Sequence, residues 1–182
     1  VGVEVNSGGD ILINGTIKDV AGLTKLTSAD QIILINSDAV IGGASINLTA
    51  VNGIGSANTL QTSLTDTGAG SMSAVTTRGD IRINEISGDL IVNRIVTANT
   101  AGDVFLSSRG NIFAAAVYDV GTDNLIRGGA ISLTSEFGGI GTLGTGGTAS
   151  TPGAGARTIT IDSGNTMARD RVTVTASQSI FL

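Results

Sequence analysis

A short pattern occurs twice in this chain, about 85 residues apart. Residues 43–55 read GASINLTAVNGIG, and residues 129–141 read GAISLTSEFGGIG when gaps are allowed. In both copies small residues lead into alternating apolar and polar residues, then a polar corner, then Gly-Ile-Gly. Alternation followed by glycine is typical of a short β-strand that ends in a turn. The sequence therefore predicts a repeat protein built from strands.

Further segments share this pattern of a turn and then a short strand. No segment has the apolar spacing of a helix, and the intervals between strands are too short for helical connections. We therefore expect an all-β fold with almost no helix. The segments are 9–14, 30–36, 79–84, 102–107, 158–162 and 171–175. Together with the two copies of the first pattern, the first apolar residues of their strands are taken as Ile11, Ile33, Ile46, Ile81, Val104, Ile131, Ile159 and Val172.

Coils of roughly 20 to 28 residues, each with two or three short strands, are typical of a parallel β-helix, or β-solenoid. A β-sandwich is the alternative, because short alternating strands with turns also build one. The order of the segments repeats between the first and second halves of the chain, and this supra-repeat favours the solenoid, because a sandwich does not require it. In the solenoid we expect two columns of inward side chains. The first is Ile11, Ile33, Ile81 and Val104, and the second is Ile13, Ile35, Ile83 and Leu106. The side chains of Leu12, Leu34, Arg82 and Phe105 should point outward, and Asn14, Asn36 and Asn84 should lie at one corner.

The domain organisation follows from the same repeats. Residues 1–182 are predicted to form a single solenoid segment with two supra-repeats, about 10–78 and 80–157, and a partial third. Residues 113–125 have no counterpart in the first copy and are interpreted as an excursion between coils. Residues 144–156 are rich in glycine and are interpreted as a loop, with a linker as the competing interpretation.

Composition excludes several classes of function. The chain has no Cys and no His, which removes disulfides, thiolate chemistry, imidazole bases and the usual zinc ligands. Ten Lys and Arg against 15 Asp and Glu leave no basic stripe, so no nucleic-acid partner is expected. No apolar run approaches a membrane span, so no membrane insertion is expected. The start at Val1 suggests a processed protein or a segment of a longer one.

The Gly-Asp-Ile-x-Ile segments and the Ile-x-Leu-Thr-x-x-x-Gly-Ile-Gly segment resemble repeats of large bacterial exoproteins of the filamentous haemagglutinin type and of other giant surface adhesins. The resemblance covers nearly the whole chain. It implies a right-handed β-helical shaft that projects from a bacterial cell, and hence an extracellular location. The family's Asn-Pro-Asn secretion motif is absent, since Pro152 is the single proline.

Arg78-Gly79-Asp80 spells the tripeptide that integrins recognise, which makes it a weak adhesion motif. Gly-Asp also occurs at 9–10, 88–89 and 102–103 without the arginine, so turn chemistry is the alternative explanation. Asp10, Asp80 and Asp103 occupy one repeat position, and neighbouring coils could bring some of them together around calcium. Solvated turn residues are the alternative, and no other cofactor is expected.

Catalysis is not expected. The three glutamates, Glu4, Glu85 and Glu136, do not lie in an acid cluster with aromatic neighbours. With no Trp, one Tyr and four Phe, a groove that stacks sugars is difficult to build. A carbohydrate-binding or carbohydrate-active β-helix stays open as an alternative, because a pair of carboxylates suffices for glycoside cleavage.

Two regions are candidates for interaction. The first is the outward face with Leu12, Leu34 and Phe105, which is apolar enough for an interface unless residues 113–125 cover it. The second is the terminal sequence Ile180-Phe181-Leu182, which has no charge to prevent strand pairing. We expect self-association or continuation into further coils.

The function expected from these features is a structural and adhesive shaft or filament subunit that contacts a host or a neighbouring cell. The other alternative is a calcium-dependent surface-layer module.

Overall fold

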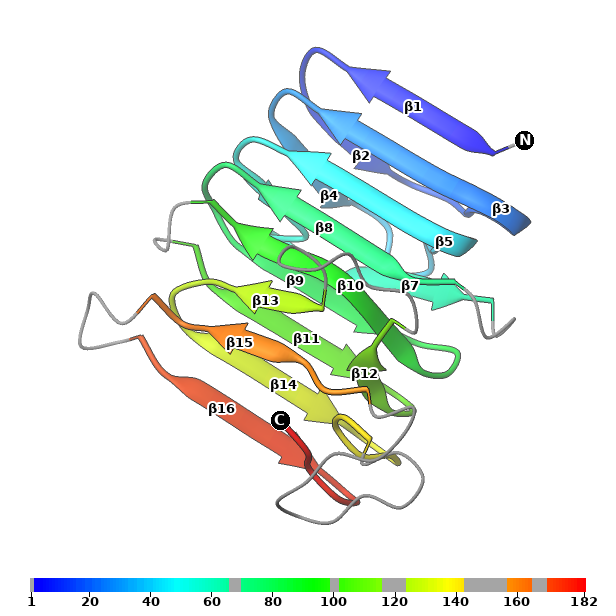
Figure 1. The fold of residues 1–182 in the computed structure, drawn as a ribbon. Coiled ribbons are helices and arrows are strands. Elements are labelled where there is room, and N and C mark those ends of the chain that lie inside the picture. The colour runs from blue at the N-terminus through cyan, green and yellow to red at the C-terminus, as the bar shows by residue number, and fades with distance from the viewer. Residues whose placement is uncertain (1, 66–69, 99–101, 116–123, 143–156, 165–169) are drawn as a thin grey trace.

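The computed structural model describes residues 2–65, 70–98, 102–115, 124–142, 157–164 and 170–182. These residues form sixteen strands and no helix, and every strand pairing among them is parallel (Figure 1). Parallel pairing between successive coils is the pattern of a β-solenoid, whereas a β-sandwich needs antiparallel sheets. The all-β prediction and the solenoid prediction are therefore confirmed, and the sandwich is excluded.

One row of parallel strands, the first row, runs the length of the molecule. Successive members pair with one another, and three of them are long enough to turn a corner. A register shift between Asp19 and Leu23 marks such a corner in the second strand, as bulges do elsewhere. The first row consists of β1 (Val3–Ser7), β3 (Ile17–Ser28), β5 (Ile41–Ala50), β8 (Met72–Thr76), β10 (Leu90–Thr97), β13 (Leu125–Arg127) and β15 (Thr160–Asp162).

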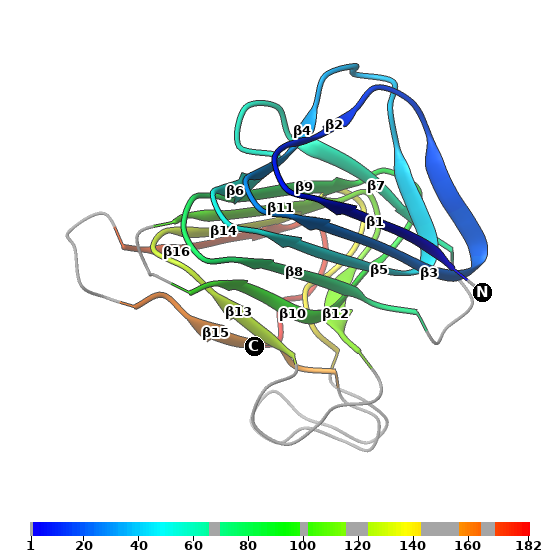
Figure 2. The same cartoon turned by 90° about the horizontal axis from the view of Figure 1, so that it is seen from above.

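A second row lies behind the first, and short strands close the coil on a third side (Figures 1 and 2). The third side is made by β7 (Leu60–Leu64), β12 (Ile112–Ala114) and the first residues of β3, β5 and β10. The second row consists of β2 (Ile11–Ile13), β4 (Gln31–Leu34), β6 (Gly53–Ile54), β9 (Ile81–Glu85), β11 (Val104–Ser108), β14 (Ile131–Ser135) and β16 (Val172–Ala176).

The handedness can be followed in Figure 2, which looks down from the N-terminal end. The chain enters along β1, crosses to β2 and returns through β3, turning clockwise as it recedes from the viewer. A clockwise path away from the viewer is right-handed. The coil length also agrees with expectation, because the first-row column Val5, Leu26, Leu48, Ala74 and Ile95 advances by 21, 22, 26 and 21 residues.

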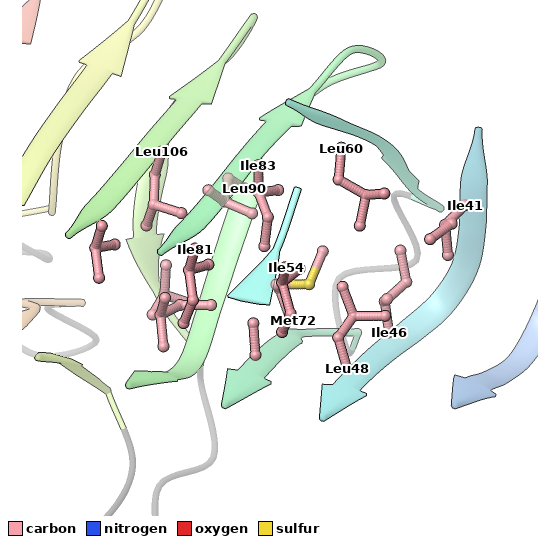
Figure 3. Packing of buried hydrophobic residues seen from close by; sticks show 14 of the residues in the cluster. Ile41, Ile46, Leu48, Ile54, Leu60, Met72, Ile81, Ile83, Leu90 and Leu106 are labelled. Carbon is pink, nitrogen blue, oxygen red and sulfur yellow. The ribbon is translucent and has the colours of Figure 1, made fainter. Parts of the chain in front are cut away.

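The core is a stack of aliphatic side chains between the two rows (Figure 3). In the second row one column repeats the same position on every coil, and burying each Ile contributes roughly 1.5–3 kcal/mol. Because neighbouring members pair directly, each coil seals the apolar surface of the next. That column is Ile11, Ile32, Ile54, Ile81, Val104, Ile131 and Val172.

The predicted register is wrong on one coil. Ile32 and Leu34 point inward and are 0% and 3% exposed, whereas Ile35 is 51% exposed. Ile33 pairs with Leu12 at an outward position. Four aliphatic residues follow one another here, so alternation does not fix which face is buried. In the observed register the Gln31 amide donates to the Asp10 carboxylate (3.1 Å), and Gln31 takes the position that aspartate holds on other coils. The other inward residues of both predicted columns are buried as expected.

The two copies of the opening pattern do not occupy equivalent places. Residues 46–50 of β5 lie in the first row, whereas β14 lies in the second. A strand followed by a tight corner needs similar residues on any side of the coil. The recurring pattern therefore marks strands with corners, and it does not mark equivalent positions on successive coils. Of the predicted excursion 113–125, the ends belong to β12 and β13, and residues 116–123 lie outside the described residues. The predicted loop 144–156 also lies outside them.

Candidate functional surfaces

Aspartates line the turn that enters the second row, and each carboxylate accepts a backbone amide from the next coil. Asp10 accepts from Gln31 (3.1 Å), Asp80 from Asp103 (3.0 Å), and Asp103 from Ala130 (3.0 Å). Each bond satisfies an amide at a corner where the strand ladder is interrupted. This arrangement supports the turn interpretation of the Gly-Asp segments. Within the described residues, no three Asp or Glu converge on a point where they could hold a metal ion.

The Arg78-Gly79-Asp80 turn is held by its neighbours. Arg78 Nε donates to Asn52 Oδ1 (2.8 Å), and Asp80 pairs with Arg82 (2.8 Å). Gly79 has a φ of +82°, and a Cβ there would collide with the Asn52 carbonyl. Glycine is required by this backbone conformation, which L side chains rarely adopt. Turn chemistry therefore accounts for the glycine, and contacts within the solenoid hold both charged side chains.

The three residues of the predicted apolar face differ in exposure. Leu12 is 56% exposed, as expected of an outward residue. Leu34 is buried, so its assignment to the face was wrong for the register reason given above. Phe105 points outward but is half-buried, because the Arg82 guanidinium lies 3.9 Å from its ring centroid. The structure does not gather the three residues into one patch.

The terminal segment Ile180-Phe181-Leu182 lies against the last described coil. Ile180 forms a parallel bridge with Ile140, and the Phe181 amide donates to the Ile140 carbonyl (2.6 Å). Ile180 and Leu182 are nevertheless 44% and 57% exposed. The segment thus adds an edge to the third side while leaving apolar surface open.

Exposed large apolar residues are confined to the two ends of the solenoid in the described chain. None of them lies between residues 36 and 136. Their separation into two terminal groups leaves the middle coils of the described chain without a large exposed apolar side chain. The groups are Leu12, Val20, Leu23 and Ile35 near the N-terminal end, and Phe137, Val172, Ile180 and Leu182 near the C-terminal end.

Glu85 is a buried carboxylate that the sequence reasoning missed. Its side chain is 0% exposed and accepts four hydrogen bonds. Oε2 accepts from Thr62 Oγ1 and the Leu64 amide (both 3.0 Å), and Oε1 accepts from Ser87 Oγ (2.7 Å) and the Ser87 amide (3.2 Å). None of the ion pairs in the described residues includes it. Burial raises the pKa of Glu85 above its usual value, against the opposing effect of these donors.

A sequence signal for Glu85 did exist. It pairs in register with Ser108, which pairs with Ser135, so a glutamate replaces a small buried hydroxyl on one coil only. An acidic residue at an inward position of a strand needs several donors to be stable there. Ser87 lies two residues away in the sequence, but the other two donors, Thr62 and Leu64, come from the previous coil, and the local sequence does not reveal them.

A shallow pocket of about 360 Å³ lies over the corner that follows β9, β11 and β14. The Arg109 guanidinium lies 6.0 Å from the centroid of the Phe137 ring, and Phe137 is 59% exposed. A cation, an aromatic face and carboxylate and amide groups therefore surround one hollow. Its lining residues are Asn84, Glu85, Ile86, Arg109, Glu136 and Phe137.

Searches for related proteins give no functional assignment. No protein-family model, curated protein or solved structure matches this chain. In the described residues, no helix is long and apolar enough to span a membrane. The β-solenoid is compatible with a β-helical repeat region, and any function has to be argued from its surfaces.

Proposed function

We propose that this chain is a structural segment of an adhesive shaft on the outside of a bacterial cell. It acts by length, rigidity and display of repeated surface, without catalysis. The observation that carries the proposal is the continuity of the stacked columns from one end of the molecule to the other, combined with apolar surface at both ends.

Continuity supports a load-bearing role. The inward column of the first row passes from Val5 to Ile161, and that of the second row from Ile11 to Val172. Each coil is joined to the next by a parallel ladder of hydrogen bonds, so the molecule is a short rod that rises about 4.8 Å per coil. Further coils added at either end would extend the rod without altering its cross-section.

The ends support association. In the described structure β1 pairs only with β3, and β16 pairs only with β14. Their outer edges therefore present unpaired backbone donors and acceptors, which readily template another strand. Val5 and Val174 sit half-buried on these outermost coils and would be sealed by a neighbouring coil. We infer that further coils, from a longer chain or from another copy, cover both ends.

The adhesin part of the proposal rests on the resemblance of the repeats to large bacterial exoproteins. In this interpretation the contact is with a host surface or a neighbouring cell, and the charge-poor, aliphatic repeats provide the shaft. The Arg78-Gly79-Asp80 turn contributes to the shaft's internal bonding.

The test is the association of the 182-residue chain at increasing concentration. We expect light scattering to show growth beyond a monomer. Val174→Lys places a charge on the inward column of the last coil and should suppress growth, whereas Thr175→Lys, at the adjacent outward position, should not. Circular dichroism controls for folding in both variants. A chain that stays monomeric at every concentration would refute the open-ended shaft.

A second candidate, carbohydrate binding without cleavage, is favoured by the pocket beside Phe137. An exposed aromatic face next to Arg109 and Glu136 could stack on a sugar ring and bond its hydroxyls. Titration with acidic and neutral oligosaccharides, followed by NMR, tests it. Shifts lost in Phe137→Ala but kept in Phe105→Ala would support binding at this pocket, and no shift with any sugar would exclude it.

A further inference from the structure

The chain contains two Asn-Gly dipeptides, and the solenoid places them in opposite environments. They are Asn14-Gly15 and Asn52-Gly53. Asn-Gly is the dipeptide most open to internal attack, because glycine has no Cβ to hinder approach to its own amide nitrogen. The sequence gives no reason for the two to react differently.

Asn14-Gly15 lies in the open turn between β2 and β3. Asn14, Gly15 and Thr16 are all exposed, and a Cβ built on Gly15 would meet nothing within 4 Å. The Asn14 backbone carbonyl accepts a hydrogen bond from Asn36 Nδ2 (3.1 Å). Among the described residues no hydrogen bond holds its side-chain amide, so that group can rotate towards the following nitrogen.

In Asn52-Gly53, both the nitrogen and the oxygen of the Asn52 side-chain amide are hydrogen-bonded. Asn52 Nδ2 donates to Asp30 Oδ1 (2.8 Å), and Asn52 Oδ1 accepts from Arg78 Nε (2.8 Å). Gly53 is buried and begins β6, in a conformation with φ of +144°. Attack by the Gly53 nitrogen would require both side-chain bonds to break and the strand to open locally.

We propose that Asn14 is a self-modification site that deamidates in the folded protein, while Asn52 is protected. The deprotonated Gly15 nitrogen attacks Asn14 Cγ, a C–N bond forms, and the side-chain amino group leaves as ammonia. Water then opens the five-membered succinimide at either carbonyl. The products are aspartate, or isoaspartate in which the main chain runs through the side-chain carbon.

The consequence falls on the first coil. Either product adds a negative charge at a corner where Asn36 now donates to the Asn14 carbonyl. Isoaspartate also lengthens the backbone by one carbon immediately after β2. In the described structure β2 pairs only with β4, so it belongs to the first coil, at the N-terminal end of the solenoid. Ageing of this single turn would therefore alter an end of the solenoid without touching its core.

The experiment incubates the folded 182-residue chain at mildly alkaline pH and follows two tryptic peptides, 1–18 and 26–78, by mass spectrometry. We expect Asn14 to convert and Asn52 to convert at least about tenfold more slowly, because two hydrogen bonds oppose its reaction. In urea, where both turns are open, the two sites should react at similar rates. Equal rates in the folded protein, or faster reaction at Asn52, would overturn the proposal.

Gly15→Ala is the matched control variant. Gly15 has open space around it, so the folded structure should tolerate the methyl group, while attack by the residue-15 nitrogen is hindered. Conversion of Asn14 should slow markedly, and enzymatic methylation of isoaspartate should fall with it. An unchanged rate would exclude the succinimide route and with it the proposal.

Discussion

The buried carboxylate of Glu85 should make the stability of the solenoid depend on pH in an unusual direction. Burial raises its pKa in the folded state, whereas the unfolded chain retains the ordinary value near 4.5. Below that value both states are protonated, and the stability is fully present. As pH rises towards the folded pKa, the unfolded chain releases its proton first. The free energy of unfolding then falls, by at most about 1.4 kcal/mol per pH unit.

Two substitutions separate charge from hydrogen bonding. Glu85→Gln resembles the protonated acid, so near pH 4 it should cost less than about 1.5 kcal/mol, the worth of one net hydrogen bond. At higher pH the wild type loses stability through ionisation of Glu85 and the Gln variant does not. The free energy of unfolding of Glu85→Gln relative to wild type should therefore rise with pH. Glu85→Ala leaves the donors from Thr62, Leu64 and Ser87 without an acceptor and should cost at least about 3 kcal/mol near pH 4, and this cost should shrink as the wild type loses stability at higher pH.

The assay is urea unfolding of wild type and both variants between about pH 4 and pH 8, a range that spans the normal carboxyl and imidazole pKa values. Because the chain contains no histidine, carboxylates dominate the titration in this window. The ¹³C shift of the Glu85 carboxyl gives its pKa directly. If Glu85→Gln instead loses stability relative to wild type as pH rises, the four donors outweigh burial and the reasoning fails.

Three further predictions test the register, the turn and the metal. Ile83→Asp should cost more than about 4 kcal/mol in thermal unfolding, because it buries an unpaired carboxylate. Arg82→Asp should cost about 1–2 kcal/mol through loss of a partly buried ion pair and a ring contact, and similar losses for the two variants would contradict the assigned register. Gly79→Ala should destabilise by about 2 kcal/mol or more because of its positive φ, while Gly88→Ala, with nothing within 4 Å, should change stability by less than about 1 kcal/mol. Adding a chelator should leave the melting temperature unchanged, and a clear drop in circular dichroism melts would revive the calcium hypothesis.

The fold could be predicted because its main signal is local. Alternation from Ile81 to Ile83 and from Val104 to Leu106, each after Gly-Asp, sets both the strand and its inward face. The same signal failed between Ile32 and Ile35, where every residue is apolar and alternation does not show which residues point inward.

The candidate sites were less predictable because they depend on which coils become neighbours. Two of the four hydrogen bonds to Glu85 come from donors 21 and 23 residues earlier, and Phe105 is covered by Arg82 from the previous coil. The clustering of exposed apolar residues at the two ends is likewise visible only after burial is known. Composition gave the absence of Cys and His, but it could not identify these contacts.

The parallel ladder between coils has a mechanical consequence. Its hydrogen bonds point along the axis of the solenoid, so a force that pulls the two termini apart along that axis loads them one at a time, starting at an end. The chain should therefore yield by peeling, one coil after another, rather than by a single rupture. Each coil of 21 residues, such as the one from Val5 to Leu26, would release about 70 Å of extended chain. A shaft built in this way would lengthen stepwise under tension and could absorb a pull before its attachment fails.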